Sequence, residues 1–235
     1  MLLPFLSLLR NDSLLTVRRL AAGPTLASLF LGCAFCATAG DSLSAPRTRK
    51  ILAFGDSLVA GFAVPRKAGF TVQLEKSLAA AGFPAEVINA GIPGDTSAGG
   101  RARLAQTLDV EPDLVLLELG ANDNLLGLPP AELEANLEAI IQILEQRHIP
   151  VLLTGIEPLR DLGKSYRTEF TGVFSRLAQK HQMPFYPDFL AGVAGRPELN
   201  KNDGIHPNPK GVKEIVRRIL PLVMETLQKL PASTP

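Results

Sequence analysis

The chain has 235 residues, of which 46% are hydrophobic and 20% charged, as in an ordinary globular protein. Its formal net charge is +1, and no basic cluster alternates with aromatic residues, so the electrostatic footprint of a nucleic-acid-binding protein is missing. We therefore expect one catalytic or binding domain of moderate size and no nucleic-acid partner.

Residues 1–40 have the pattern of an export segment. The basic pair Arg18 and Arg19 precedes a long apolar stretch, and residues 37–39 have the small-x-small pattern that signal peptidase cleaves. The segment predicts an exported protein, periplasmic or secreted, that loses this segment. Two alternatives remain open: an uncleaved membrane anchor, and a lipoprotein acylated on Cys33.

The two cysteines of the chain, Cys33 and Cys36, lie inside the same apolar stretch. Their C-x-x-C spacing occurs in redox pairs, but those pairs lie where a strand meets a helix, and this one does not. We interpret both cysteines as part of the export segment. A chain cut after Ala39 would then have no disulfide, and core packing would have to stabilise it.

The rest of the chain divides into a linker at residues 41–49, a folded domain at 50–230 and a short tail at 231–235. Within the domain, short apolar runs alternate with segments of helical spacing, without internal repeats. The runs predict strands at 50–54, 86–89, 114–119, 151–154 and 185–186. The spacing predicts helices at 69–81, 97–108, 131–147, 165–181 and 209–230.

Strands that are apolar on both faces and separated by helices indicate a parallel sheet covered on each side, that is, a doubly wound α/β sandwich. In such sheets, ligands bind beyond the carboxyl ends of the strands. The functional residues should therefore lie in the loops that follow Phe54, Asn89 and Leu119.

The first of these loops reads Gly-Asp-Ser-Leu at residues 55–58. A serine at a strand-to-helix turn exposes its hydroxyl, and its own N–H points toward the same space, which suits a nucleophile. The alternative is that Ser57 merely caps a helix.

The second and third loops offer hydrogen-bond donors. Gly94 has no side chain to keep a ligand from its N–H, and Asn122 places an amide just beyond the longest apolar run. Either could bind an oxyanion. The alternatives are a Pro93-Gly94 turn followed by a helix cap at Asp95 or Thr96, and an Asx turn at Asn122.

A fourth segment, before the last predicted helix, contains Asp203 and His206. A spacing of three within a turn can bring the carboxylate beside the imidazole, where it fixes the tautomer of a general base. The other histidines, His148 and His181, lie at helix ends, where interaction with the helix dipole explains them. The alternative for Asp203 is that it caps a turn.

Taken together, the four segments resemble the GDSL or SGNH family of lipases and esterases. The matches are residues 55–58, Gly94, residues 120–123 and residues 203–207, in the order found in that family. The sequence around Gly94 and before Gly120 is also similar to the subgroup of bacterial periplasmic acyl-CoA thioesterases I, lysophospholipases L1 and arylesterases. One difference is Ala121, where many relatives have a second glycine.

The resemblance implies a flavodoxin-like three-layer sandwich with a parallel five-stranded sheet. It implies that Ser57 is the nucleophile, His206 the base and Asp203 its orienting acid, and that the N–H groups of Ser57 and Gly94 with the Asn122 amide form the oxyanion hole. It implies no metal and no cofactor. The expected substrate is a small acyl ester or thioester, and the expected state is a monomer that contacts a membrane only through an uncleaved or lipidated N-terminal segment.

Two other functions remain open. The same catalytic set could serve a carbohydrate O-deacetylase, although leucines near the loops favour acyl chains. Alternatively, the chain could be a non-catalytic protein that binds a ligand on a flavodoxin-like sheet. We expect substrate specificity to depend on residues 158–166, whose Gly163 and charged residues suggest a mobile loop. The leucines in question are Leu125, Leu126, Leu128, Leu159 and Leu162.

Overall fold

The computed structural model describes residues 47–231, and their framework is a five-stranded parallel sheet with the order β2-β1-β3-β4-β5. The predicted α/β fold is confirmed. The predicted export segment lies outside the described residues, as does most of the linker, so the domain boundaries stay predictions. The strands are β1 (Arg49–Gly55), β2 (Ala85–Gly91), β3 (Leu114–Glu118), β4 (Val151–Thr154) and β5 (Phe185–Tyr186).

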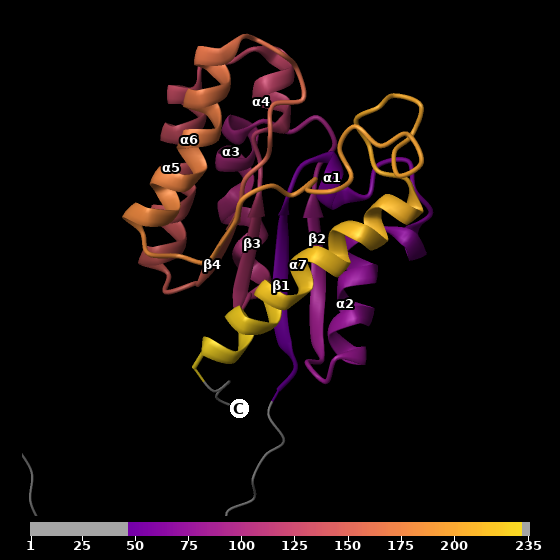
Figure 1. Cartoon of the computed structure of the whole chain (residues 1–235). Helices are drawn as coiled ribbons and strands as arrows, with labels where there is room; N and C mark the ends of the chain where they lie inside the picture. Colours follow the sequence, from indigo (N-terminus) through magenta and orange to yellow (C-terminus); the bar gives the residue numbers. More distant parts are fainter. Residues whose placement is uncertain (1–46, 232–235) are drawn as a thin grey trace, which may run out of the picture. The chain divides into compact units, whose positions relative to one another are not determined.

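Helices cover both faces of the sheet (Figure 1), which makes the three-layer sandwich that was predicted. Helix α7 packs against α2 on one side, while α5 packs against both α3 and α6 on the other. Within residues 47–231, no helix has both the length and the apolar character needed to cross a membrane. The helices are α1 (Ser57–Ala60), α2 (Phe70–Ala80), α3 (Ser97–Thr107), α4 (Ala121–Leu126), α5 (Pro130–Gln146), α6 (Lys164–Lys180) and α7 (Pro209–Lys229).

The centre of the sheet is apolar on both faces because both faces are covered. Residues 51–54 of β1 and 114–117 of β3 are all buried, as a parallel strand between two helical layers requires. Their register pairs Gly55 with Glu118 on one side and with Gly91 on the other. The carboxyl ends of β1, β2 and β3 therefore lie side by side, and the loops that follow them start from one edge of the sheet.

Gly91, at the end of β2, leaves room for the turn that follows β1. A Cβ at this position would lie 2.7 Å from the Cα of Ala60 and 2.7 Å from the carbonyl oxygen of Asp56. Both are backbone atoms, which cannot move aside as a side chain can. We expect Gly91→Ala to lower the free energy of unfolding by roughly 1–3 kcal/mol, measured by urea denaturation.

A matched control is Gly172→Ala on α6, where the added methyl would meet only the end of the flexible Arg176 side chain. This variant should be neutral or more stable, because alanine favours a helix over glycine by about 0.5–1 kcal/mol. Equal stability of the Gly91→Ala variant and the wild type would contradict the close approach of β2 to the α1 turn.

His181, at the end of α6, has a role that the sequence did not reveal. Its Nδ1 lies 2.8 Å from Glu145 and its Nε2 3.0 Å from Glu138, both on α5. Burial alone would lower the pKa of His181, but hydrogen bonds and the charges of the two glutamates raise it above the usual 6.5. His181 therefore links α6 to α5, and its interaction with the helix dipole stays a prediction.

This link makes the stability of the fold depend on pH. Because folding raises the pKa of His181, its stabilising effect is complete below about pH 6.5 and disappears as pH rises through the folded-state value. Burial alone would raise the pKa of Glu138, but the contacts with Lys180 and His181 lower it to about 2. Glu138 therefore stays ionised over this whole pH range. His181→Gln should lower Tm clearly near pH 5.5 and less near pH 9. The exposed His148→Gln serves as control, and equal Tm losses at both pH values would contradict the link.

Candidate functional site

The loop after β1 places Ser57 at the start of a short helix rather than in its cap. The cap is Asp56, whose Oδ1 accepts a hydrogen bond of 2.9 Å from the N–H of Leu58. The alternative in which Ser57 merely caps a helix is therefore wrong. With the capping role filled by its neighbour, the Ser57 hydroxyl is available to face the cavity above the sheet edge.

Ser57, His206 and Asp203 form one hydrogen-bonded chain. The Ser57 Oγ lies 3.0 Å from Nε2 of His206, and Nδ1 of His206 lies 2.9 Å from Oδ2 of Asp203. The segment between β5 and α7, which carries the last two residues, crosses to the side of α1 before α7 begins (Figure 1). The structure thus brings together three residues that the sequence had singled out.

The Asp203 carboxylate is held from two sides. Its Oδ1 accepts hydrogen bonds from the N–H groups of Ile205 and His206, both 2.9 Å, so Asp203 caps the turn as well as meeting the imidazole. Partial burial alone would raise its pKa, but these bonds and the His206 ring lower the pKa of Asp203 to about 2. A carboxylate ionised at neutral pH accepts from Nδ1–H, which leaves the Nε2 lone pair facing Ser57.

The turn that carries His206 is closed by its neighbours. Asn200 and Pro207 form an antiparallel bridge, and the N–H of Lys201 donates to the carbonyl of His206 at 2.8 Å. Directly afterwards, Asn208 caps α7, and Pro209 occupies the first turn, where its missing N–H costs nothing. The imidazole is therefore fixed between a closed turn and a helix start.

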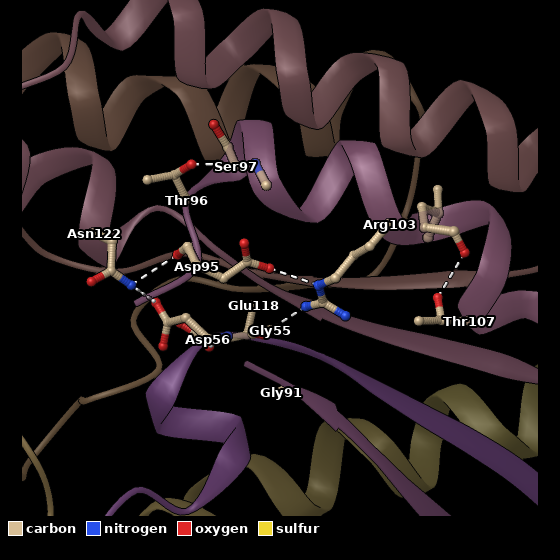
Figure 2. Close-up of polar contacts among 12 residues, drawn as sticks. Gly55, Asp56, Gly91, Asp95, Thr96, Ser97, Arg103, Thr107, Glu118 and Asn122 are labelled. Atoms are coloured by element: carbon tan, nitrogen blue, oxygen red, sulfur yellow. Dashed lines mark hydrogen bonds and ion pairs between the residues drawn. The ribbon is translucent and has the colours of Figure 1, made fainter. Parts of the chain in front are cut away.

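Gly94 and Asn122 lie beside Ser57 in the same cavity. Gly94 has φ of 82° in a turn closed by the N–H of Asp95 and the carbonyl of Ile92 at 3.1 Å, as predicted for Pro93-Gly94. Asn122 lies in α4 rather than in an Asx turn. Its amide nitrogen donates to the carbonyl of Asp95 at 2.8 Å and to Oδ2 of Asp56 at 3.2 Å (Figure 2), which fixes the NH₂ end of the amide on that side.

A pair of buried carboxyl groups lies under this site. Asp56 and Glu118 are both almost fully buried, and the N–H of Asp56 donates to Oε2 of Glu118 at 3.3 Å. Burial raises the pKa of Asp56 to about 6, although the hydrogen bond from Leu58 lowers it. Burial and the neighbouring Asp56 also raise the pKa of Glu118 well above its usual range.

Gly55 makes room for this acid pair. A Cβ on Gly55 would lie 2.6 Å from Oε2 of Glu118 and 2.5 Å from the Glu118 carbonyl. The sequence did not reveal Glu118 as part of the site. The available signal was a single acidic residue at the end of the otherwise apolar run 114–119.

The cavity above these residues has a volume of about 190 Å³ and mostly apolar walls. The Phe62 ring lies 4.9 Å from the His206 ring at an interplanar angle of 50°. Of the five leucines considered from the sequence, Leu125 and Leu159 line the cavity, whereas Leu126 is 64% exposed. The lining residues are Ser57, Leu58, Phe62, Pro93, Gly94, Ala121, Asn122, Leu125, Leu159, Ile205 and His206.

The loop at residues 158–166 is tied to α4. The Asn124 amide donates to the carbonyl of Arg160 at 3.0 Å and its oxygen accepts from the N–H of Arg160 at 2.7 Å. The Tyr166 hydroxyl also donates to the carbonyl of Leu128 at 3.0 Å. The backbone of Arg160 is therefore anchored to α4 next to Leu159, which lines the cavity, and the mobility of the loop stays a prediction.

Comparison with known proteins agrees with this geometry. Residues 53–213 match the profile of the GDSL-like Lipase/Acylhydrolase family. The chain belongs to this family. It is 38% identical over 177 residues to the arylesterase of Vibrio mimicus, covering 75% of this chain and 86% of that protein. It is 35% identical over 175 residues to thioesterase 1/protease 1/lysophospholipase L1 of Escherichia coli (strain K12), covering 74% and 79%.

A solved esterase has the same fold. The psychrotrophic esterase EstA from Pseudoalteromonas sp., in a structure described as inhibited by monoethylphosphonate, superposes with a TM-score of 0.73 at 30% identity. The match covers 77% of this chain and all of that chain. The protein is accordingly an ester hydrolase of the GDSL or SGNH type, as the sequence predicted.

Proposed function

We propose that the protein hydrolyses acyl esters or thioesters with Ser57 as nucleophile, His206 as general base and Asp203 as the residue that orients His206. The observation that carries this proposal is the hydrogen-bonded chain of 3.0 and 2.9 Å that joins the three side chains and ends at an apolar cavity. A hydroxyl is a weak nucleophile, and a neighbouring imidazole in the correct tautomer is what activates it.

In the first half of the reaction, His206 takes the Ser57 proton while Oγ bonds to the acyl carbon. The bond to the leaving oxygen or sulfur then breaks, and His206 gives the proton to the departing alcohol or thiol. In the second half, His206 takes a proton from water, the resulting hydroxide attacks the acyl-enzyme, and Oγ leaves with the proton. The products are a carboxylic acid, the alcohol or thiol and the starting enzyme.

The oxyanion that forms in each half needs donors that are in place beforehand. We assign this role to the N–H groups of Ser57 and Gly94 and to the Asn122 amide, all of which border the cavity. Asn122 would donate to the oxyanion in exchange for its 3.2 Å hydrogen bond to Asp56. Within the described residues, the N–H of Gly94 has no hydrogen-bond acceptor, which leaves it available to a ligand. Preorganised donors of this kind supply about 2.7–4 kcal/mol of transition-state stabilisation each.

The cavity walls favour an acyl group over a sugar. Phe62, Leu125, Leu159 and Ile205 present apolar surface around Ser57, and such surface binds hydrocarbon chains. The small volume of about 190 Å³ favours short and medium acyl groups within the cavity. We therefore place acyl esters and thioesters ahead of carbohydrate acetates.

We also propose that the enzyme acts outside the cytoplasm. The support is in the sequence: the basic pair Arg18 and Arg19, the apolar stretch after it and the small-x-small pattern at residues 37–39. A lipid on Cys33 or an uncleaved anchor would hold the enzyme at a membrane instead. Mass spectrometry of the protein recovered from the periplasmic and membrane fractions would distinguish the three forms.

The proposed substrate class can be tested with p-nitrophenyl esters of increasing acyl length, together with an acyl-CoA thioester and an acetylated sugar. We expect kcat/KM to rise from acetate to butyrate or hexanoate and then to fall, with little activity on the sugar. Highest activity on the acetylated sugar would contradict the acyl preference. Absence of activity on every ester would contradict the proposed function.

A further inference from the structure

Arg103 is a partly buried charge that lies on α3, outside the cavity. Its Nε donates to Oδ2 of Asp95 at 2.7 Å and its Nη2 donates to the carbonyl of Gly55 at 2.9 Å (Figure 2). Its guanidinium carbon also lies 4.0 Å from the centre of the Phe54 ring. The Arg103 and Asp95 side chains are only 15% and 11% exposed, so the ion pair is largely removed from water.

The two acceptors of Arg103 belong to the loops that carry the proposed oxyanion donors. Gly55 lies two residues before Ser57, and Asp95 directly follows Gly94. The carbonyl of Asp95 in turn accepts the 2.8 Å hydrogen bond from the Asn122 amide. The Arg103 guanidinium therefore contacts the segments of Ser57 and Gly94 directly. It is linked to Asn122, the third proposed donor, through one further hydrogen bond.

The start of α3 is built around the Asp95 carboxylate. A Cβ on Gly99 would collide with Oδ1 of Asp95, so the helix has no side chain where the carboxylate lies. Thr96 caps the helix by accepting from the N–H of Gly99 at 3.2 Å. Ser97 donates to Asp123 of α4 through its N–H at 2.9 Å, which ties the same turn to the helix that carries Asn122.

We infer that Arg103 is a positioning residue that sets the relative places of the three oxyanion donors, an inference that rests on the proposed function. A buried ion pair is a weak source of stability, because desolvation offsets most of the attraction between the charges. A guanidinium has planar, directed N–H groups, so it fixes two acceptors at a defined separation. A lysine ammonium in its place would keep the charge but lose the fork.

The test compares Arg103→Lys and Arg103→Met with Arg101→Met, an exposed arginine on the same helix. We expect Arg103→Met to lower kcat for p-nitrophenyl butyrate by about 10- to 100-fold, since a displacement of about 1 Å can cost 10²-fold. KM should change by less than about twofold because the apolar walls stay. Arg103→Lys should fall between this variant and the wild type, and Arg101→Met should match the wild type.

A second readout separates positioning from a general loss of stability. An alkylboronic acid forms a tetrahedral adduct with a serine nucleophile and places an oxygen where the oxyanion forms. We expect its inhibition constant to rise in Arg103→Met by the same factor as kcat/KM falls, whereas inhibition by butyrate stays unchanged. Tm and circular dichroism of each variant show whether it is folded. If Arg103→Met does not fold, Asp95→Asn, which keeps the backbone carbonyl and the side-chain shape, replaces it with the same expectation.

The inference would be overturned if a folded Arg103→Met or Asp95→Asn variant had the kcat of the wild type. It would also be overturned if the variant lost kcat but bound the boronic acid as tightly as the wild type does. A wild-type protein that neither hydrolyses the ester nor binds the boronic acid would overturn the proposed function and this inference with it. The activity of the wild type therefore distinguishes failure of the proposed function from failure of the inference about Arg103 alone.

Discussion

Ser57→Ala should lower kcat for p-nitrophenyl butyrate by on the order of 10⁶-fold, the size of loss that removal of a serine nucleophile causes in a hydrolase with an intact triad. The variant removes one oxygen, whose hydrogen-bond partner in the described structure is Nε2 of His206. No backbone conformation depends on that oxygen, because Asp56 caps α1. Tm should therefore stay close to that of the wild type.

The matched control is Ser175→Ala, which removes an exposed hydroxyl on α6 that donates to the carbonyl of Gly172 at 3.0 Å. It should be fully active. A serine-directed phosphonate should add one equivalent to the wild type and to Ser175→Ala but none to Ser57→Ala, as mass spectrometry would show. Retained esterase activity in folded Ser57→Ala would exclude Ser57 as the nucleophile.

Asp203→Asn should lower kcat by about 10⁴-fold, although it changes one atom. Its oxygen can still accept from the N–H groups of Ile205 and His206, which now hold Oδ1 at 2.9 Å. The new NH₂ group then faces Nδ1 of the imidazole. A donor at this place selects the tautomer with the proton on Nε2, which cannot accept the proton of Ser57.

The control for this substitution is Asp109→Asn, an exposed acid in the short 3₁₀ helix (Leu108–Val110) that follows α3. Nuclear magnetic resonance of the imidazole nitrogens would report the tautomer directly: Nδ1 should be protonated in the wild type and Nε2 in Asp203→Asn. Loss of kcat without a change of tautomer would show that Asp203 acts in another way. Unchanged kcat would remove Asp203 from the mechanism.

The sheet could be predicted from the sequence because its cause is local. Each central strand contains an uninterrupted apolar run, and residues 51–54 and 114–117 can be recognised without knowing what covers them. The rule that ligands bind at the carboxyl ends of parallel strands then directed attention to three loops that start from one edge of the sheet. The candidate residues Ser57, Gly94 and Asn122 all border one cavity for this reason.

Helix α4 could not be predicted because its causes are distant in sequence. Asparagine and aspartate favour turns, so the segment after Gly120 has the composition of a loop. In the fold, Asp123 accepts from Ser97 at 2.9 Å, and Asn124 pairs with the backbone of Arg160. These partners are 26 and 36 residues away, and they convert turn-forming residues into a partly buried helix.

The same limit applies to the charges around the site. Glu118, Asp95 and Arg103 were visible as charged residues, but their roles depend on which loops the strand register brings together. Gly55, for example, is needed because Glu118 lies beside it, and that pairing follows from the alignment of β1 with β3. Local sequence patterns do not predict which residues the pairing of distant strands brings together.

The two halves of the reacting pair come from opposite ends of the folded chain. Ser57 follows the first strand, whereas His206 precedes the last helix, 149 residues later. No fragment that lacks either end can assemble the chain of hydrogen bonds, and α7, which follows the His206 turn, packs against α2. On the proposed mechanism, hydrolytic activity is therefore a direct measure of complete folding, and a nascent or partly folded chain would not act on cellular esters before it reaches its final structure.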